Sequence, residues 1–225
     1  MLDGLAARHK VVGVDYPGSG KTPRSSTPLS LDDLADQLVA AAVAEGLETF
    51  AVSGYSLGGP VAVRAAARHP ERVTALVLTA TFAHGDNRLA LSVPLWRRLA
   101  LTDPELLAHF LVMMAMGADA LEATPSEQLE QAVAYTAANI AEGTPEHAEL
   151  ASRMDVRDDL AHIQAPTLVV STTQDWFTST RLHHALADSI PGARLVEIPT
   201  GHLPMVERPE EWQKLITDFT GAHSA

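Results

Sequence analysis

A serine flanked by glycines at fixed spacing is the first group in this sequence whose type and setting suggest chemistry. Gly54, Ser56 and Gly58 form a G-x-S-x-G pentad between a strand-like segment at 49–52 and a helix-like run at 60–69. In that setting the pentad acts as a nucleophile elbow, a sharp turn that exposes the serine hydroxyl. Glycine is expected on both sides because a side chain two positions from the serine would collide with the neighbouring strand or helix. The pattern predicts a nucleophilic Ser56; the alternative is an ordinary turn whose serine caps the helix.

A serine hydroxyl needs a base to take its proton, and the base needs a carboxylate that fixes its tautomer. Functional side chains in open α/β sheets gather at the C-terminal ends of strands. Asp175 follows a strand-like run at 167–171 and His202 follows one at 194–198, in the chain order Ser, Asp, His that this elbow type uses. Asp86, after an earlier strand, is the alternative acid. Histidines in helical or terminal contexts are expected to be solvated: His9, His69, His147, His183, His184 and His223.

The elements that must position these groups alternate along the chain. Apolar runs predict strands at 10–15, 49–53, 73–79, 167–171 and 193–198. Helical patterns follow at 31–45, 57–69 and 179–189, with a last helix that ends near 219. This alternation of strands and helices predicts an α/β fold with a mostly parallel sheet flanked by helices.

A helical insertion interrupts that alternation. Between 82 and 160 strand patterns are missing, and helix starts are predicted at Asp103-Pro104, Thr124-Pro125 and Thr144-Pro145. Thr124 and Glu127 also have capping-box spacing. We therefore expect a core of residues 1–81 and 161–225, with a helical lid at 82–160. The expected substrate contacts are Tyr55, Trp96, Phe110, Met113 and Trp176, with Met114 and Met116 as further apolar candidates.

Composition narrows the function classes. The 225 residues fit one domain, and the absence of cysteine excludes disulfides, thiolate catalysis and thiolate metal ligands. A formal net charge of -12 disfavours nucleic acid or an anionic membrane as a partner. The start of the chain lacks a signal-peptide pattern, and no apolar span is long enough to cross a bilayer, so we expect a cytoplasmic protein.

Two motifs that resemble ligand sites fail on chemical grounds. Gly18 to Thr22 is similar to the end of a phosphate-binding loop, but Asp15 stands where that loop needs glycine and Pro17 removes an N–H. His183 and His184 are adjacent, so in a helix they point apart and lack a third ligand. We therefore expect no nucleotide, no other cofactor and no metal.

Several motifs resemble the α/β-hydrolase superfamily. They are Gly54-Tyr55-Ser56-Leu57-Gly58-Gly59, the late Asp175, Gly201-His202 followed by Glu207-Arg208-Pro209 and Phe219, and the upstream loop Asp15-Tyr16-Pro17-Gly18-Ser19-Gly20. The resemblance extends over nearly the whole chain and is weakest in the insertion. It implies that Ser56 is the nucleophile, His202 the general base and acid, and Asp175 the carboxylate that orients the histidine.

The start of the chain departs from that family. Members begin with further strands, and a His-Gly loop after the third strand supplies one of two oxyanion donors. In this sequence the match begins after that loop, so the fold is expected to be N-terminally shortened. The Leu57 N–H is then the one inherited donor, and the loop from Tyr16 to Ser19 is the nearest candidate for the second. The sheet could be completed in three ways where the strands are missing: the neighbouring strands close up, a second subunit donates structure, or the native chain is longer. We expect a homodimer.

The sequence is compatible with three functions. The first is a serine acyl hydrolase that acts through an acyl-enzyme on an ester or thioester of an apolar acid. The second transfers the acyl group from a carrier-bound thioester instead, with Arg97 and Arg98 as a docking site for an acyl-carrier protein. The third is a non-catalytic binding or scaffold protein that has kept the fold.

Overall fold

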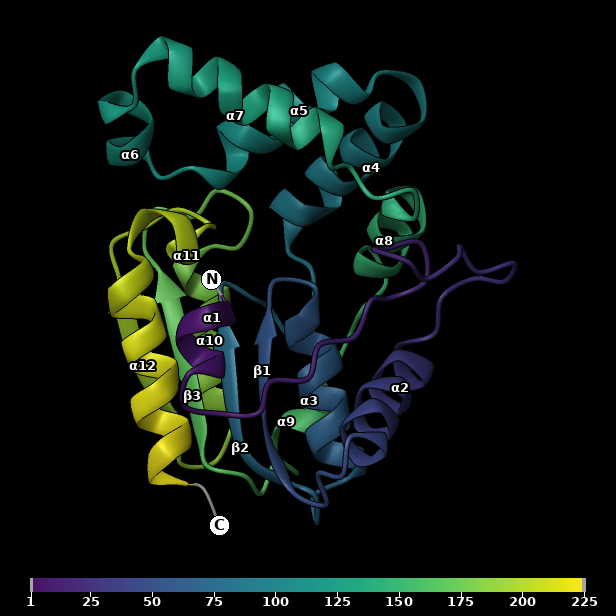
Figure 1. The fold of residues 1–225 in the computed structure, drawn as a ribbon, viewed down its shortest axis with the longest axis vertical. Coiled ribbons are helices and arrows are strands. Elements are labelled where there is room, and N and C mark those ends of the chain that lie inside the picture. Colours follow the sequence, from purple (N-terminus) through teal and green to yellow (C-terminus); the bar gives the residue numbers. More distant parts are fainter. Residues whose placement is uncertain (1, 224–225) are drawn as a thin grey trace.

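The computed structural model describes residues 2–223 and is built on one parallel sheet (Figure 1). Within those residues the sheet has four strands in the order β1 (Phe50–Tyr55), β2 (Val73–Thr79), β3 (Thr167–Thr172) and β4 (Arg194–Ile198). Each strand is parallel to its neighbour, so all four C-terminal ends lie at the same edge. The parallel sheet and these four strands are confirmed.

Helices cover both faces of the sheet. On one face α3 (Gly58–Arg68), α9 (Arg157–Leu160) and α10 (Thr180–Ser189) pack on the strands, and α2 (Leu31–Ala44) packs on α3. On the other face lie α1 (Leu2–Ala6) and α12 (Pro209–Ala222). Successive side chains on a strand point to opposite faces, so Leu76 and Leu78 belong to the first core while Val77 packs with Trp212.

The segment between β2 and β3 is helical. It contains α4 (Asn87–Thr102), α5 (Pro104–Ala115), α6 (Ala118–Ala123), α7 (Ser126–Ala138) and α8 (Thr144–Ala151) before α9. Asp103 caps α5 by accepting a hydrogen bond from Leu106 N at 2.9 Å, as the Asp-Pro start predicts. Figure 1 shows α4 to α7 as a layer beyond the C-terminal ends of the strands, whereas α9 returns to the sheet. After β4, α11 (Pro204–Glu207) leads into α12.

Two local predictions are wrong. Residues 10–15 form no strand, because the described sheet ends at β1, and Val11 is 39% exposed. In Figure 1 this segment runs obliquely to the strands, so β-branched composition alone does not supply a pairing partner. Thr124 does not form a capping box with Glu127, because its hydroxyl donates back to Ala120 O at 2.6 Å. Helix α7 begins after Pro125 without a side-chain cap.

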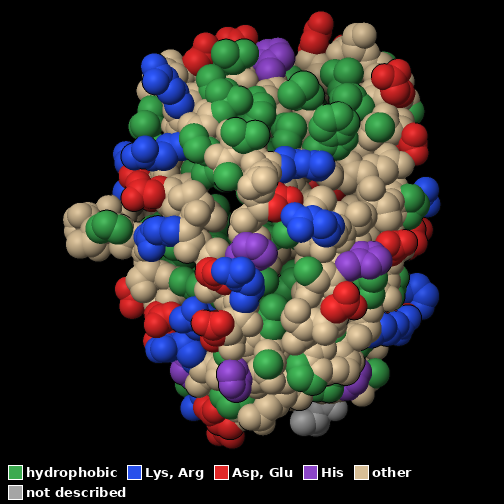
Figure 2. All heavy atoms as spheres, turned by 180° about the vertical axis from the view of Figure 1, so that it is seen from behind, with side chains coloured by type: hydrophobic (Ala, Val, Ile, Leu, Met, Phe, Trp, Pro, Cys, Tyr) green, Lys and Arg blue, Asp and Glu red, His purple; other side chains and the backbone are tan. Residues whose placement is uncertain are grey.

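The outer surface of the insertion exposes several large hydrophobic side chains. Figure 2 shows hydrophobic side chains gathered across the upper part of the molecule. Exposed large hydrophobic residues of α4, α5 and α7 are Leu91, Leu95, Leu101, Leu106, Met113 and Tyr135. None of the helices in residues 2–223 combines the length and hydropathy needed to cross a membrane.

Candidate active site

The turn at Ser56 is a strained passage from strand to helix. β1 ends at Tyr55, Ser56 has a φ of 51°, and α3 begins two residues later. A positive φ costs a non-glycine residue about 1–3 kcal/mol, so surrounding contacts must hold it. Ser56 N donates to Thr79 O at 3.1 Å, and the Thr81 hydroxyl donates to Ser56 O at 2.6 Å. The end of β2 therefore fixes the turn.

The glycine prediction is right at one position and wrong at the other. A Cβ at Gly54 would lie 2.6 Å from Gly58 O and 2.7 Å from Ala62 Cβ, because the strand is pressed against α3. A Cβ at Gly58 would meet no atom within 4 Å, so the predicted collision does not occur there. The close approach falls one residue later, at Gly59, where a Cβ would lie 2.0 Å from Thr81 Oγ1. Gly59 rather than Gly58 lets the helix approach the end of β2.

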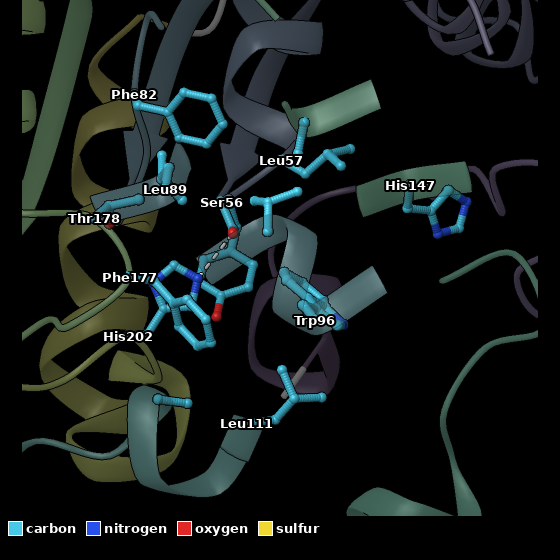
Figure 3. A pocket seen from close by; sticks show the side chains of 14 residues that line it. Ser56, Leu57, Phe82, Leu89, Trp96, Leu111, His147, Phe177, Thr178 and His202 are labelled. Atoms are coloured by element: carbon cyan, nitrogen blue, oxygen red, sulfur yellow. Dashed lines mark hydrogen bonds between the residues drawn. The ribbon is translucent and has the colours of Figure 1, made fainter. Parts of the chain in front are cut away.

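Ser56, His202 and Asp175 form one hydrogen-bonded row. His202 Nε2 lies 2.8 Å from Ser56 Oγ (Figure 3), and His202 Nδ1 lies 2.7 Å from Asp175 Oδ2. The three residues follow the ends of β1, β4 and β3, and parallel strands bring those ends together. Asp86 has a different position: its carboxylate caps α4 by accepting from Arg88 N and Leu89 N. The acid beside the histidine is therefore Asp175.

The His202 imidazole contacts two aromatic rings, and its backbone N–H is also bonded. Its ring centroid lies 5.1 Å from that of Tyr55 and 5.1 Å from that of Phe177. His202 N donates to Ala115 O, the last residue of α5, at 2.7 Å. The Glu207 carboxylate adds to this junction, since it accepts from Gly117 N at 3.0 Å and from Gly201 N. The insertion and the loop after β4 thus meet at the histidine.

Asp175 is buried and accepts five hydrogen bonds. Phe177 N and Thr178 N donate to Oδ1, while the hydroxyls of Thr172 and Thr178 join His202 at Oδ2. Burial by itself would raise the pKa of this carboxyl group, but the charge of His202 and the hydrogen bonds from His202 and Thr178 outweigh it. The net result is a pKa below the usual range, so Asp175 is a carboxylate at neutral pH.

A cavity of about 230 Å³ opens beside Ser56, and its wall is mostly apolar (Figure 3). Its lining residues are Tyr55, Ser56, Leu57, Phe82, Leu89, Val93, Trp96, Leu111, Ala115, His147, Ala151, Phe177, Thr178 and His202. Of the expected substrate contacts, Tyr55 and Trp96 are among them. The Phe110 ring packs against Phe177 at a centroid distance of 6.2 Å, while Met113 and Trp176 are each 55% exposed and lie outside the lining.

The sequence-based expectation for His183 is wrong, because this residue is fully buried rather than solvated. His147 is half-buried and lines the cavity, with Nε2 2.9 Å from Pro17 O. A signal for His183 was present, since Leu182, His183 and Leu186 recur at helical spacing on the face of α10 that packs on the sheet. Thr178 and Phe177 were also missed, because their role depends on the loop shape after β3.

The sequence predicts the Leu57 N–H as a donor to a negative oxygen beside Ser56. Leu57 N–H lies at the start of α3 and donates to no acceptor in the part of the chain that the structure describes. The loop from Tyr16 to Ser19 packs against the start of α8 instead, where Gly143 N donates to Gly18 O at 2.9 Å. The source of a second donor therefore stays a prediction. Residues 2–223 contain no group of three or more His, Asp or Glu side chains suited to a metal ion.

A parallel sheet covered on both faces, with a serine at a strand-to-helix elbow and an Asp–His pair after two later strands, is the arrangement of hydrolases with an open α/β sheet. A family model described as alpha/beta hydrolase fold matches residues 1–209, and the chain belongs to that family.

Named relatives of the chain are hydrolases. It is 31% identical over 221 residues to the pyrrolizixenacetamide deacetylase of Xenorhabdus hominickii, covering 97% of this chain and 83% of the relative. It is 30% identical to a pimeloyl-(acyl-carrier protein) methyl ester esterase of Neisseria meningitidis, covering 97% and 86%. A solved hydrolase from Pseudomonas aeruginosa superposes with a TM-score of 0.85 at 27% identity, covering 98% of this chain and 83% of that one. In general terms the chain is therefore a hydrolase.

Proposed function

We propose that this protein is a serine-dependent acyl hydrolase that cleaves an ester or thioester of a small apolar acid through an acyl-enzyme at Ser56. The proposal rests on one observation: Ser56 Oγ, His202 and Asp175 are hydrogen-bonded in series at 2.8 and 2.7 Å at the wall of an apolar cavity. A base within hydrogen-bond reach of a hydroxyl, itself oriented by a carboxylate, is what serine nucleophiles require.

In this mechanism His202 Nε2 takes the Ser56 proton while Oγ attacks the acyl carbon. The Asp175 carboxylate stabilises the imidazolium that forms, and Leu57 N–H donates to the negative oxygen of the tetrahedral intermediate. His202 then gives its proton to the leaving oxygen or sulfur, which departs and leaves the acyl group on Ser56. In the second half a water molecule attacks this ester while His202 takes its proton. The bond between the acyl group and Ser56 Oγ then breaks, His202 returns the proton to Oγ, and the free acid leaves.

The cavity wall supports an apolar acyl group. Phe82, Leu89, Val93 and Leu111 contribute hydrocarbon, and a cavity of about 230 Å³ suits a small group better than a long chain. The relatives' names include a deacetylase, a putative carbamate hydrolase and a methyl ester esterase, and each such reaction involves attack at an acyl carbon.

A second candidate is action on a carrier-bound acyl group, by hydrolysis or by transfer to another acceptor. One relative is named for an acyl-carrier-protein ester. Arg97 and Arg98 are exposed on α4, although Arg97 lies 3.5 Å from Glu149. We expect the double change of both arginines to glutamate to raise KM for a carrier-bound ester and leave KM for a small ester unchanged; equal effects on both substrates would exclude carrier docking.

A fluorophosphonate probe tests the nucleophile directly. The wild-type protein should be labelled on Ser56 and should hydrolyse p-nitrophenyl acetate, and Ser56→Ala should abolish both. Ser53→Ala is the matched control, because Ser53 is an exposed serine on the same strand. Absence of labelling and turnover in the wild-type protein would favour the scaffold alternative.

A further inference from the structure

The hydrogen-bonded row does not end at Asp175. Its Oδ2 also accepts from the Thr178 hydroxyl at 2.8 Å, and Thr178 Oγ1 lies 3.0 Å from His183 Nε2. On the other side of the ring, His183 Nδ1 lies 3.1 Å from Ser171 Oγ. All of these side chains are buried, so the row continues from the cavity into the core between β3 and α10.

The chemistry of the groups fixes the direction of every bond. A carboxylate only accepts, so the Thr178 hydroxyl must donate its hydrogen to Asp175. The oxygen of Thr178 is then the acceptor for His183, which must carry its proton on Nε2. Nδ1 is left as an acceptor for the Ser171 hydroxyl. Burial lowers the pKa of His183 to about 4, which agrees with this neutral tautomer at pH 7.

We propose that His183 is a positioning residue for Asp175: its Nε2–H occupies the Thr178 oxygen and keeps the Thr178 hydroxyl hydrogen directed at Asp175 Oδ2. This inference rests on the proposed function, because it gives His183 a role only if Asp175 orients the His202 base. Bonds that point the same way polarise one another, so the donor strength of Thr178 depends on the bond that it receives.

The loop after β3 explains why such support is needed. Asp175 and Thr178 lie between the end of β3 and the start of α10, whereas His183 and Ser171 lie on those two elements themselves. A loop side chain held by groups on a strand and a helix keeps its orientation better than one held only within the loop. The neighbouring His184 lies on the exposed side of α10, with Nε2 3.0 Å from Glu197 Oε1, and takes no part in the row.

Steady-state kinetics with three variants test the proposal, using p-nitrophenyl acetate as the probe substrate. His183→Leu puts an apolar side chain of similar bulk in place of the imidazole and removes the N–H. We expect kcat to fall by about tenfold while KM stays within twofold of the wild-type value. His183→Gln restores an N–H donor toward Thr178 and should recover most of the lost kcat. His184→Gln is the matched control and should match the wild-type protein.

A purely structural role for His183 predicts a different outcome. In that case kcat would follow thermal stability, and His183→Gln would be no better than an equally destabilised His183→Leu. That pattern, an unchanged kcat in His183→Leu, or a loss that appears only in KM would each overturn the proposal. If His183→Leu does not fold, Ser171→Ala serves instead: it keeps the imidazole but removes the hydrogen bond to Nδ1, and kcat should fall by roughly twofold to threefold. An unchanged kcat there would also overturn the proposal.

Ser56→Ala separates this proposal from the proposed function. If Ser56→Ala keeps its turnover, the proposed function fails and the positioning role fails with it. If Ser56→Ala is inactive while His183→Leu has the wild-type kcat, the positioning role alone fails.

Discussion

Acid should destabilise the folded protein through one buried imidazole. Burial lowers the pKa of His183 from 6.5 to about 4, against a smaller opposing effect of the Asp175 charge. In the unfolded chain the same group takes up its proton near pH 6.5. Between pH 6.5 and pH 4 the unfolded state therefore binds more protons than the folded state. The free energy of unfolding consequently decreases as the pH is lowered through this range. The stabilising contribution is complete above pH 6.5 and is lost toward pH 4.

The size of this effect follows from the pKa difference. Each pKa unit between the folded and unfolded states corresponds to 1.36 kcal/mol, so neutral His183 contributes about 3 kcal/mol at pH 7 that is lost on acidification. A domain is typically stable by about 5–15 kcal/mol, so protonation of this single group on acidification removes a large share of the free energy of unfolding.

Urea unfolding of three proteins at pH 7, 6, 5 and 4 measures it. His183→Gln and His183→Leu do not titrate at this position, whereas Asp175 and the other carboxyl groups remain in all three proteins. Both variants should be less stable than the wild-type protein at pH 7. The gap in the free energy of unfolding should close by about 3 kcal/mol as the pH falls to 4. Stability curves that stay parallel from pH 7 to pH 4 would refute the reasoning.

Three further predictions concern the elbow, the junction and the sheet edge. Gly54→Ala and Gly59→Ala should each lower the free energy of unfolding by about 1–3 kcal/mol, because their Cβ atoms meet packed neighbours. Gly58→Ala is the control, since a Cβ there has open space. Chemical unfolding measures all three variants, and an equally damaging Gly58→Ala would contradict the prediction. Glu207→Ala removes the acceptor of Gly117 N and Gly201 N, so the free energy of unfolding should fall by about 1–3 kcal/mol and kcat should fall as well. Chemical unfolding and ester hydrolysis measure the two effects, and wild-type values in both assays would count against this role. β1 has an unpaired outer edge in the described sheet, so we expect a homodimer by sedimentation velocity, and a monomer at every concentration would exclude it.

The fold was predictable where sequence pattern and tertiary structure agree. The strands at 49–53, 73–79, 167–171 and 193–198 are short apolar runs between turn residues, and each has a neighbour to pair with. Residues 10–15 have the same composition but no partner in the described residues, so they stay outside the sheet. Strand formation needs an adjacent strand, and a local pattern does not contain that information.

The candidate site was predictable to the extent that it depends on strand ends. Asp175 and His202 follow strands that become neighbours, so topology alone brings them together. The spacing of Leu182, His183 and Leu186 indicates a buried His183, but its contact with Thr178 was out of reach because that contact depends on the shape of one loop and on the orientation of α10. Met113 shows the converse limit: an apolar residue at helical spacing in α5 lies on the outer side of its helix.

The junction at residues 115–117 limits how this enzyme can diversify. Ala115 O receives the His202 N–H, and Gly117 N shares the Glu207 carboxylate with Gly201 N. A Cβ added at Gly117 would lie 2.7 Å from Gly201 N, and one added at Gly201 would lie 2.2 Å from Gly117 N. The two loops are therefore in direct backbone contact, with no room for a side chain. We therefore expect α4 and the middle of α5, which line the cavity away from this junction, to accept changes in the cavity wall more readily. A change at the end of α5 should also shift His202, whose backbone N–H donates to Ala115 O, so inherited variation in substrate choice should accumulate away from this junction.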